Sequence, residues 1–121
     1  MSADPYSATV RALFAEPAHA GGLDGGCTIA VADQDVRLEL SALVSGERVD
    51  TLRFRAWACP HVIAAAEAAC AQLEGAEIGE LLEFAAVDVM NKLAVPVEKT
   101  GRILVLEDAV RSLGRALRDR T

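Results

Sequence analysis

Several features are scarce in this sequence of 121 residues, and each absence excludes a class of protein. The chain has three cysteines, an odd number without the spacing of a disulfide framework, which indicates free thiols in a reducing compartment. Lysine and arginine number 12 against 18 acidic residues, and the net charge of −6 comes without a basic cluster. These charges argue against binding to nucleic acid or to an anionic membrane.

Long apolar segments are also missing. No apolar run approaches the roughly 18 residues of a membrane span, and the opening stretch MSADPYSATV lacks the apolar region of a secretory signal. We therefore expect a cytoplasmic protein. The sequence contains no CxxC, no HExxH, no glycine-rich phosphate loop and no nucleophile elbow, so we expect no enzymatic activity.

The residues that are present predict one α+β domain over residues 1–121. Apolar residues make up 52% of the chain and charged residues 25%, which is typical of a globular protein. Apolar and polar residues alternate in 35–44 and 48–57, and a short apolar run covers 27–32, so we expect three strands. Gly46 marks the hairpin turn between the last two strands.

Helical spacing of apolar residues predicts helices at 7–15, 60–73 and 102–118, and one or two short helices within 77–94. Ser7 is the expected N-cap of the first helix, and Glu107 and Arg111 are spaced as a surface ion pair on the last. Strands followed by helices favour a small antiparallel three-stranded sheet with the helices packed on one face.

Cys59 is the candidate functional residue because it precedes a proline at a predicted helix start. With Pro60 as the first helical residue, Cys59 becomes the N-cap. A thiol at this place faces unpaired backbone N–H groups and the positive end of the helix dipole, which favour the thiolate. The alternative is that Cys59 packs as a small apolar residue. His61 could assist the thiol, and we expect it to face solvent.

The remaining cysteines and the other histidine carry weaker signals. Cys70 lies on an apolar helical stripe with Ile63 and Leu73, so we expect it to be buried and inert. Nothing local activates Cys27, and His19 stands in a loop with no partner that the sequence predicts.

Three stretches of the chain resemble the iron–sulfur cluster assembly scaffold family, which includes the IscU type and the N-terminal domain of NifU. They are YSATVRALFAEPAHAGGL, VRLELSALVSGERVDTLRFRAWACPHVIAAAEA and VPVEKTGRILVLEDAVRSLGRAL. Their order and spacing are similar to the opening helix, the central hairpin with the second family cysteine, and the closing helix. In this resemblance Cys59 falls on the second cysteine, and Pro96 and Lys99 match the Pro-Pro-x-Lys stretch.

The same resemblance implies that the cluster site is degraded. Family members hold a cluster or zinc with three cysteines and one Asp or His. Here the first cysteine falls on Ala32 or, shifted by one residue, is replaced by the stretch from Asp33 to Asp35, and the family's His-Cys pair falls on Gly101 and Arg102. Only one family thiolate remains.

This ligand loss changes the expected chemistry of the site. Cys59, Asp33 and Asp35 would be weak metal ligands, because a cluster or a structural zinc needs about four good ones. Arg102 and Lys99, with His61 in support, would instead favour a thiolate or persulfide on Cys59. The resemblance thus implies no tightly bound cofactor, and at most a transient iron–sulfur cluster, iron or zinc.

Two functions follow from the resemblance. In the first, the protein works in iron–sulfur cluster assembly or sulfur trafficking, with Cys59 carrying a persulfide as in SufE-type sulfur acceptors. In the second, it is a non-catalytic partner that regulates the assembly machinery. The expected partners are a cysteine desulfurase or other iron–sulfur assembly proteins. A sulfur carrier needs an exposed, ionisable Cys59, whereas a regulatory partner does not.

Overall fold

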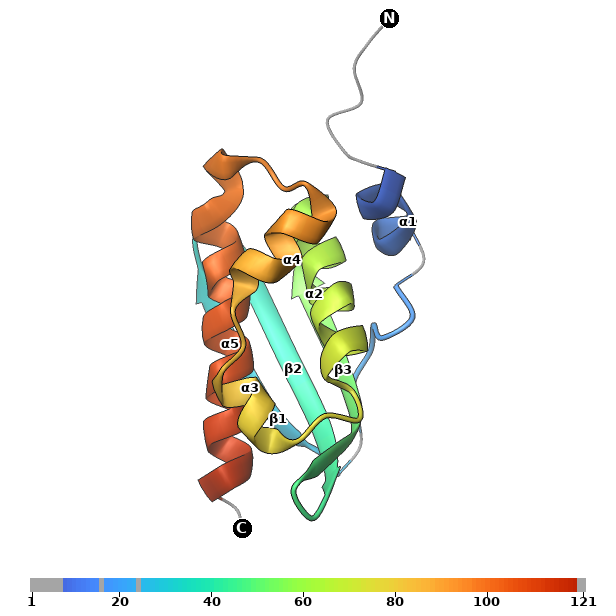
Figure 1. Cartoon of the computed structure of the whole chain (residues 1–121), viewed down its shortest axis with the longest axis vertical. Helices are drawn as coiled ribbons and strands as arrows, with labels where there is room; N and C mark the ends of the chain where they lie inside the picture. The colour runs from blue at the N-terminus through green and yellow to red at the C-terminus, as the bar shows by residue number, and fades with distance from the viewer. Residues whose placement is uncertain (1–7, 16, 24, 120–121) are drawn as a thin grey trace, which may run out of the picture.

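The computed structural model describes residues 8–15, 17–23 and 25–119, and confirms the predicted α+β class (Figure 1). The predicted N-cap Ser7 lies outside the described residues. None of the described helices is long and apolar enough to cross a membrane. In chain order the elements are α1 (Ala8–Ala15), β1 (Cys27–Asp33), β2 (Val36–Ser45), β3 (Arg48–Trp57), α2 (Pro60–Leu73), α3 (Ile78–Leu82), α4 (Ala86–Leu93), the 3-10 turn η1 (Val97–Lys99) and α5 (Thr100–Asp119).

The sheet is antiparallel with strand order β1-β2-β3. Gly46, with φ of 62°, makes the tight turn between β2 and β3 that the sequence predicted. The alternation within β2 divides the sheet into two faces, because successive side chains of a strand point to opposite sides. The buried face of β2 carries Val36, Leu38, Leu40 and Ala42.

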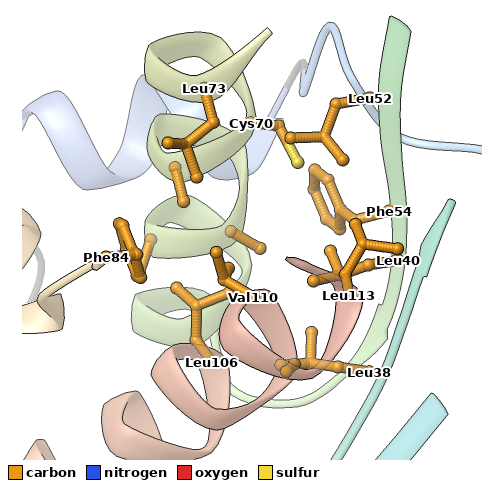
Figure 2. Packing of buried hydrophobic residues seen from close by; sticks show 14 of the residues in the cluster. Leu38, Leu40, Leu52, Phe54, Cys70, Leu73, Phe84, Leu106, Val110 and Leu113 are labelled. Atoms are coloured by element: carbon orange, nitrogen blue, oxygen red, sulfur yellow. The ribbon is translucent and has the colours of Figure 1, made fainter. Parts of the chain in front are cut away.

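Helices cover one face of the sheet only. Figure 1 shows α2 beside β3 and α5 across β1 and β2, with α3 and α4 on the outer side of this helical pair and α1 beside α2. The core lies between the sheet and α2 and α5. Figure 2 shows Cys70 next to Leu52 and Phe54, while Leu106 and Val110 of α5 face Phe84.

One prediction about a helix face is wrong, and a second holds only in part. His61 is 3% exposed and does not face solvent, because α2 is packed against the sheet, α1, α4 and α5 and has no broad solvent-facing side. Ile63, predicted on the buried stripe, is only partly buried and borders a surface cleft.

Glu107 and Arg111 form the predicted ion pair at 3.8 Å, but their main partners lie elsewhere. Glu107 Oε1 accepts the Ala86 N–H at 3.0 Å, and Arg111 Nε donates to the Phe84 carbonyl at 2.9 Å. The two side chains therefore fasten the link between α3 and α4 to the last helix.

Candidate functional site

Three segments far apart in the sequence meet at one end of the molecule (Figure 1). They are the β1–β2 turn at 33–35, the β3–α2 junction at 57–61 and the stretch 97–102. A Cβ atom added at Gly101 would lie 3.7 Å from Gln34 Oε1, so the first and third segments touch. The positive charge of Lys99 lowers the pKa of His61, so the third segment also lies near the second. The predicted site residues thus share one end of the fold.

Cys59 occupies the N-cap of α2. Its backbone is extended (φ −71°, ψ 161°), Pro60 is the first helical residue, and the Cys59 carbonyl accepts the N–H groups of Val62 at 3.0 Å and Ile63 at 3.2 Å. The thiol makes no capping hydrogen bond, and Cys59 is partly buried against the core. Cys27 and Cys70 are buried, so Cys59 is the most accessible of the three free thiols.

His61 contributes a neutral ring to this end of the fold. Burial lowers the pKa of its imidazole, and the nearby positive charge of Lys99 lowers it further, while Glu98 opposes the change. The positive charge of this region therefore comes from Lys99 and Arg102, both half-buried, and not from the histidine.

The metal ligands implied by the resemblance do not form a site. Within the part of the chain that the structure describes, no group of three or more His, Cys, Asp and Glu side chains is placed to hold a metal ion. Asp33 and Asp35 are exposed at the β1–β2 turn and form no such group with Cys59. Since a [2Fe–2S] cluster needs about four ligands, the donors among the described residues of one chain do not fit one.

The comparison with protein families decides the affiliation. The family described as "NifU-like N terminal domain" matches residues 5–115, which is nearly the whole chain. The chain belongs to this family. The resemblance to the N-terminal domain of NifU inferred from the sequence is therefore confirmed. A comparison with curated protein sequences gave no match.

Two solved structures share the fold of this NifU-like domain. One is a NifU-like protein (N-terminal) from Brucella abortus, with a TM-score of 0.73, 15% identity and 95% of each chain covered. The other, from Fervidobacterium islandicum, is described as a proposed iron–sulfur cluster assembly scaffold protein for the SUF system. It has a TM-score of 0.61 and 15% identity, and the alignment covers 88% of this chain and 82% of that chain. At this identity both likenesses show the fold alone.

The NifU-like domain also holds a polar cluster that the sequence did not predict. His19, expected to lack a partner, donates its backbone N–H to Glu67 Oε1 at 2.6 Å, and its Nδ1 lies 2.5 Å from Glu67 Oε2. Its Nε2 lies 3.5 Å from Glu74 Oε1. Glu67 is 3% exposed, so this carboxylate is buried with its hydrogen bonds satisfied. In the sequence, this cluster could have been suspected from Glu67, a charged residue on the otherwise apolar stripe of α2.

Glu74 connects this polar cluster to β3. Its Oε2 accepts the Leu52 N–H at 2.9 Å and the Arg53 Nη1 donor at 2.6 Å. Burial would raise the pKa of Glu74, but these hydrogen bonds and the charges of His19 and Arg53 outweigh it, and the pKa is lowered. The cluster therefore links the segment after α1 to both α2 and the edge strand β3.

Proposed function

We propose that this protein works in iron–sulfur cluster assembly by carrying sulfur as a persulfide on Cys59, without catalysing a reaction of its own. One observation carries the proposal: Cys59 is the accessible thiol, and it stands at a helix N-terminus where three segments meet. Family membership supplies the context, since relatives of this fold are described as cluster assembly scaffolds. A carrier thiol must stay reduced, so we also propose a cytoplasmic location.

The proposed step is a thiol–persulfide exchange with a cysteine desulfurase as donor. The Cys59 thiolate attacks the outer sulfur of a persulfide on the donor's cysteine. The S–S bond of the donor breaks, a new S–S bond forms on Cys59, and the donor cysteine leaves as a thiolate. No oxidant is consumed, because the sulfur is transferred at its existing oxidation level.

The surroundings of Cys59 suit this anionic chemistry. Cys59 lies at the positive end of the α2 dipole, a place that favours negative charge. Lys99 in η1 and Arg102 in the first turn of α5 add positive charge at the same end of the fold. A transient iron–sulfur cluster, iron or zinc would be cargo shared with a partner, since one chain supplies too few ligands.

A direct test offers glutathione persulfide to the reduced protein and maps the product by mass spectrometry of its peptides. We expect the mass of one added sulfur on the Cys59 peptide and none on the Cys70 peptide. The Cys59→Ser variant should take up no sulfur, whereas Cys70→Ala should match the wild type. Sulfur uptake by Cys59→Ser equal to that of the wild type would rule out the carrier role.

The second candidate is a regulatory partner that binds the desulfurase without accepting sulfur. Exposed apolar residues in the segments that carry the predicted site residues favour it, because Trp57 is 53% exposed and Val97 is 84% exposed. The rate of sulfide release by a desulfurase, measured with wild type and with Cys59→Ser, separates the candidates. A regulator changes this rate equally with either protein, whereas a carrier loses its effect with Cys59→Ser.

A further inference from the structure

The edge of β3 is covered over only part of its length. The Phe54 N–H donates to the His19 carbonyl at 2.9 Å, and the Gly21 N–H donates to the Phe54 carbonyl at 2.8 Å. The chain then turns away at Gly21, where φ is 131°. The short parallel bridge between Ala20 and Phe54 therefore protects the strand edge at one residue and stops.

Beyond this bridge the next edge position is open. In an antiparallel ladder, backbone groups point alternately toward the partner strand and away from it. Because both groups of Phe54 point away from β2, those of Ala56 do so as well. Within residues 8–15, 17–23 and 25–119, no backbone group forms a hydrogen bond with Ala56 on this side. Its N–H and C=O are available to a further strand.

An apolar cleft of about 370 Å³ lies along the same edge. Its walls include Phe14 of α1, Pro17, Ala56, Trp57 and Ile63 of α2. Phe14 is 44% exposed and Trp57 is 53% exposed, so two large aromatic side chains stand at a surface hollow. A strand paired with Ala56 would point alternate side chains toward this hollow.

The charges beside the cleft are positive. The Arg55 guanidinium lies against Gly22, since a Cβ atom added at Gly22 would be 2.7 Å from Arg55 Nη2. Arg37 stacks on Trp57, with its guanidinium carbon 5.3 Å from the ring centre. Glu39 is opposite Arg55 in the ladder, yet among the described side chains no carboxylate forms an ion pair with either arginine. Arg55 and Arg37 thus place two positive charges beside the cleft, against the one negative charge of Glu39, on a chain of net charge −6.

We propose that this groove, formed by the β3 edge at Ala56 and the adjoining cleft, binds an extended segment of a partner protein. That segment would add a strand to the sheet, place an apolar side chain in the cleft and present carboxylates to Arg55 and Arg37. A second copy of this chain fits poorly, because two β3 edges would bring like-charged arginines together. The inference does not use the Cys59 thiol and stands apart from the sulfur-carrier proposal.

Trp57 is the only tryptophan of the chain and reports directly on the groove. The probes are two synthetic peptides, acetyl-Glu-Leu-Glu-Val-Glu-amide and its counterpart with Lys in place of Glu. We expect the acidic peptide to shift the emission of Trp57 and to slow hydrogen exchange at the Ala56 amide. The basic peptide should bind at least about tenfold more weakly. Equal binding of both peptides, or an emission shift without protection of Ala56, would overturn the proposal.

Charge reversal sharpens the test. Arg55→Glu should weaken binding of the acidic peptide about tenfold and strengthen that of the basic peptide, while the matched surface change Arg115→Glu on α5 should alter neither. Phe14→Asp, at another exposed position, should weaken both peptides and serves if Arg55→Glu does not fold. Identical peptide affinities in wild type, Arg55→Glu and Phe14→Asp would contradict the assignment.

Two further results would replace the proposed occupant with another. The first is a dimer in sedimentation velocity that Phe14→Asp dissociates, which would assign the groove to a second copy. The second is peptide binding that appears only after residues 1–7 are removed, which would assign it to the chain's own N-terminal segment. A monomer that binds the acidic peptide with the full chain supports the partner.

Discussion

Cys59 and Cys70 belong to the same helical segment, about three turns apart, but their surroundings are opposite. Cys59 caps the helix and is only partly buried, whereas Cys70 is 1% exposed beside Leu52 and Phe54 (Figure 2). Burial raises the pKa of the Cys70 thiol, and the charges of Glu67 and Glu74 raise it further, against a smaller effect of Arg53. Position on the helix, and not residue type, therefore decides which thiol is available for chemistry.

The largest expected effect is a difference in alkylation rate between these two thiols. N-ethylmaleimide on the native protein should label Cys59 at least about a thousandfold faster than Cys70, since Cys70 reacts only when the fold opens. Mass spectrometry of peptides quenched over time gives both rates. In about 6 M guanidinium chloride, where a domain of this size is unfolded, the rates should become similar. Labelling of Cys70 in the native protein at a rate comparable to that of Cys59 would contradict the burial of Cys70.

The buried carboxylate one turn before Cys70 should matter nearly as much. Glu67→Ala leaves the His19 donors without their acceptor, and we expect a loss of about 3 kcal/mol in the free energy of unfolding. Urea denaturation followed by circular dichroism measures it. Glu83→Ala at an exposed position is the matched control and should change stability by less than about 0.5 kcal/mol. Equal effects would mean that the polar cluster does not stabilise the fold.

Substitution by serine should also affect Cys59 and Cys70 differently, with a smaller change in the free energy of unfolding. Cys70→Ser places a hydroxyl in an apolar core and should cost about 2 kcal/mol. Cys59→Ser should lie within about 0.5 kcal/mol of wild type or slightly above it, because serine is a favoured N-cap. Thermal unfolding of both variants gives the comparison. A larger loss for Cys59→Ser would show that its sulfur packs as a core atom.

The smallest effect concerns acid and the Cys59 end of the fold. His61 has a pKa lowered from 6.5 in the folded protein, so below that pH the unfolded chain binds more protons. Stability from His61 should therefore fall as the pH drops below about 6.5. Glu74, whose pKa is lowered from 4.5, keeps its contribution until the pH falls below that value.

Urea titrations at about pH 7.5 and 5.5 exclude Glu74, because this interval lies above its range, and comparison with His61→Gln separates the effect of His61 from that of the rest of the protein. The wild type should lose more stability across the interval than His61→Gln does. Glu74→Gln should show the same loss as the wild type. Identical pH dependence in wild type and His61→Gln would place the acid sensitivity elsewhere.

Much of the fold follows from local patterns in the sequence. The alternation in β2, the turn at Gly46 and the proline at the start of α2 each depend on neighbouring residues, so they could be predicted. The burial of Cys70 followed from the apolar stripe of its own helix. The burial of His61 could not be predicted in this way. Helical periodicity assumes one solvent-facing side, whereas α2 is covered by the sheet and three other helices.

The parts of the site that were missed are assembled from distant segments. His19 and Glu67 are 48 residues apart, and no local pattern links a loop histidine to a glutamate in a later helix. The cleft beside Trp57 combines α1, β3 and α2, so its lining appears only in the folded chain. The place of Cys59 at the N-cap of α2 could be predicted because proline follows it directly.

The position of α5 governs when this chain can fold during synthesis. This helix packs against β1 and β2 and, through Glu107 and Arg111, holds the link between α3 and α4, yet it follows all of these elements in the chain and leaves the ribosome after them. Until it emerges, the apolar face of the sheet's first two strands has no cover. The nascent protein therefore completes this core only after α5 has emerged, and until then the exposed strands are the surface on which chaperones would act.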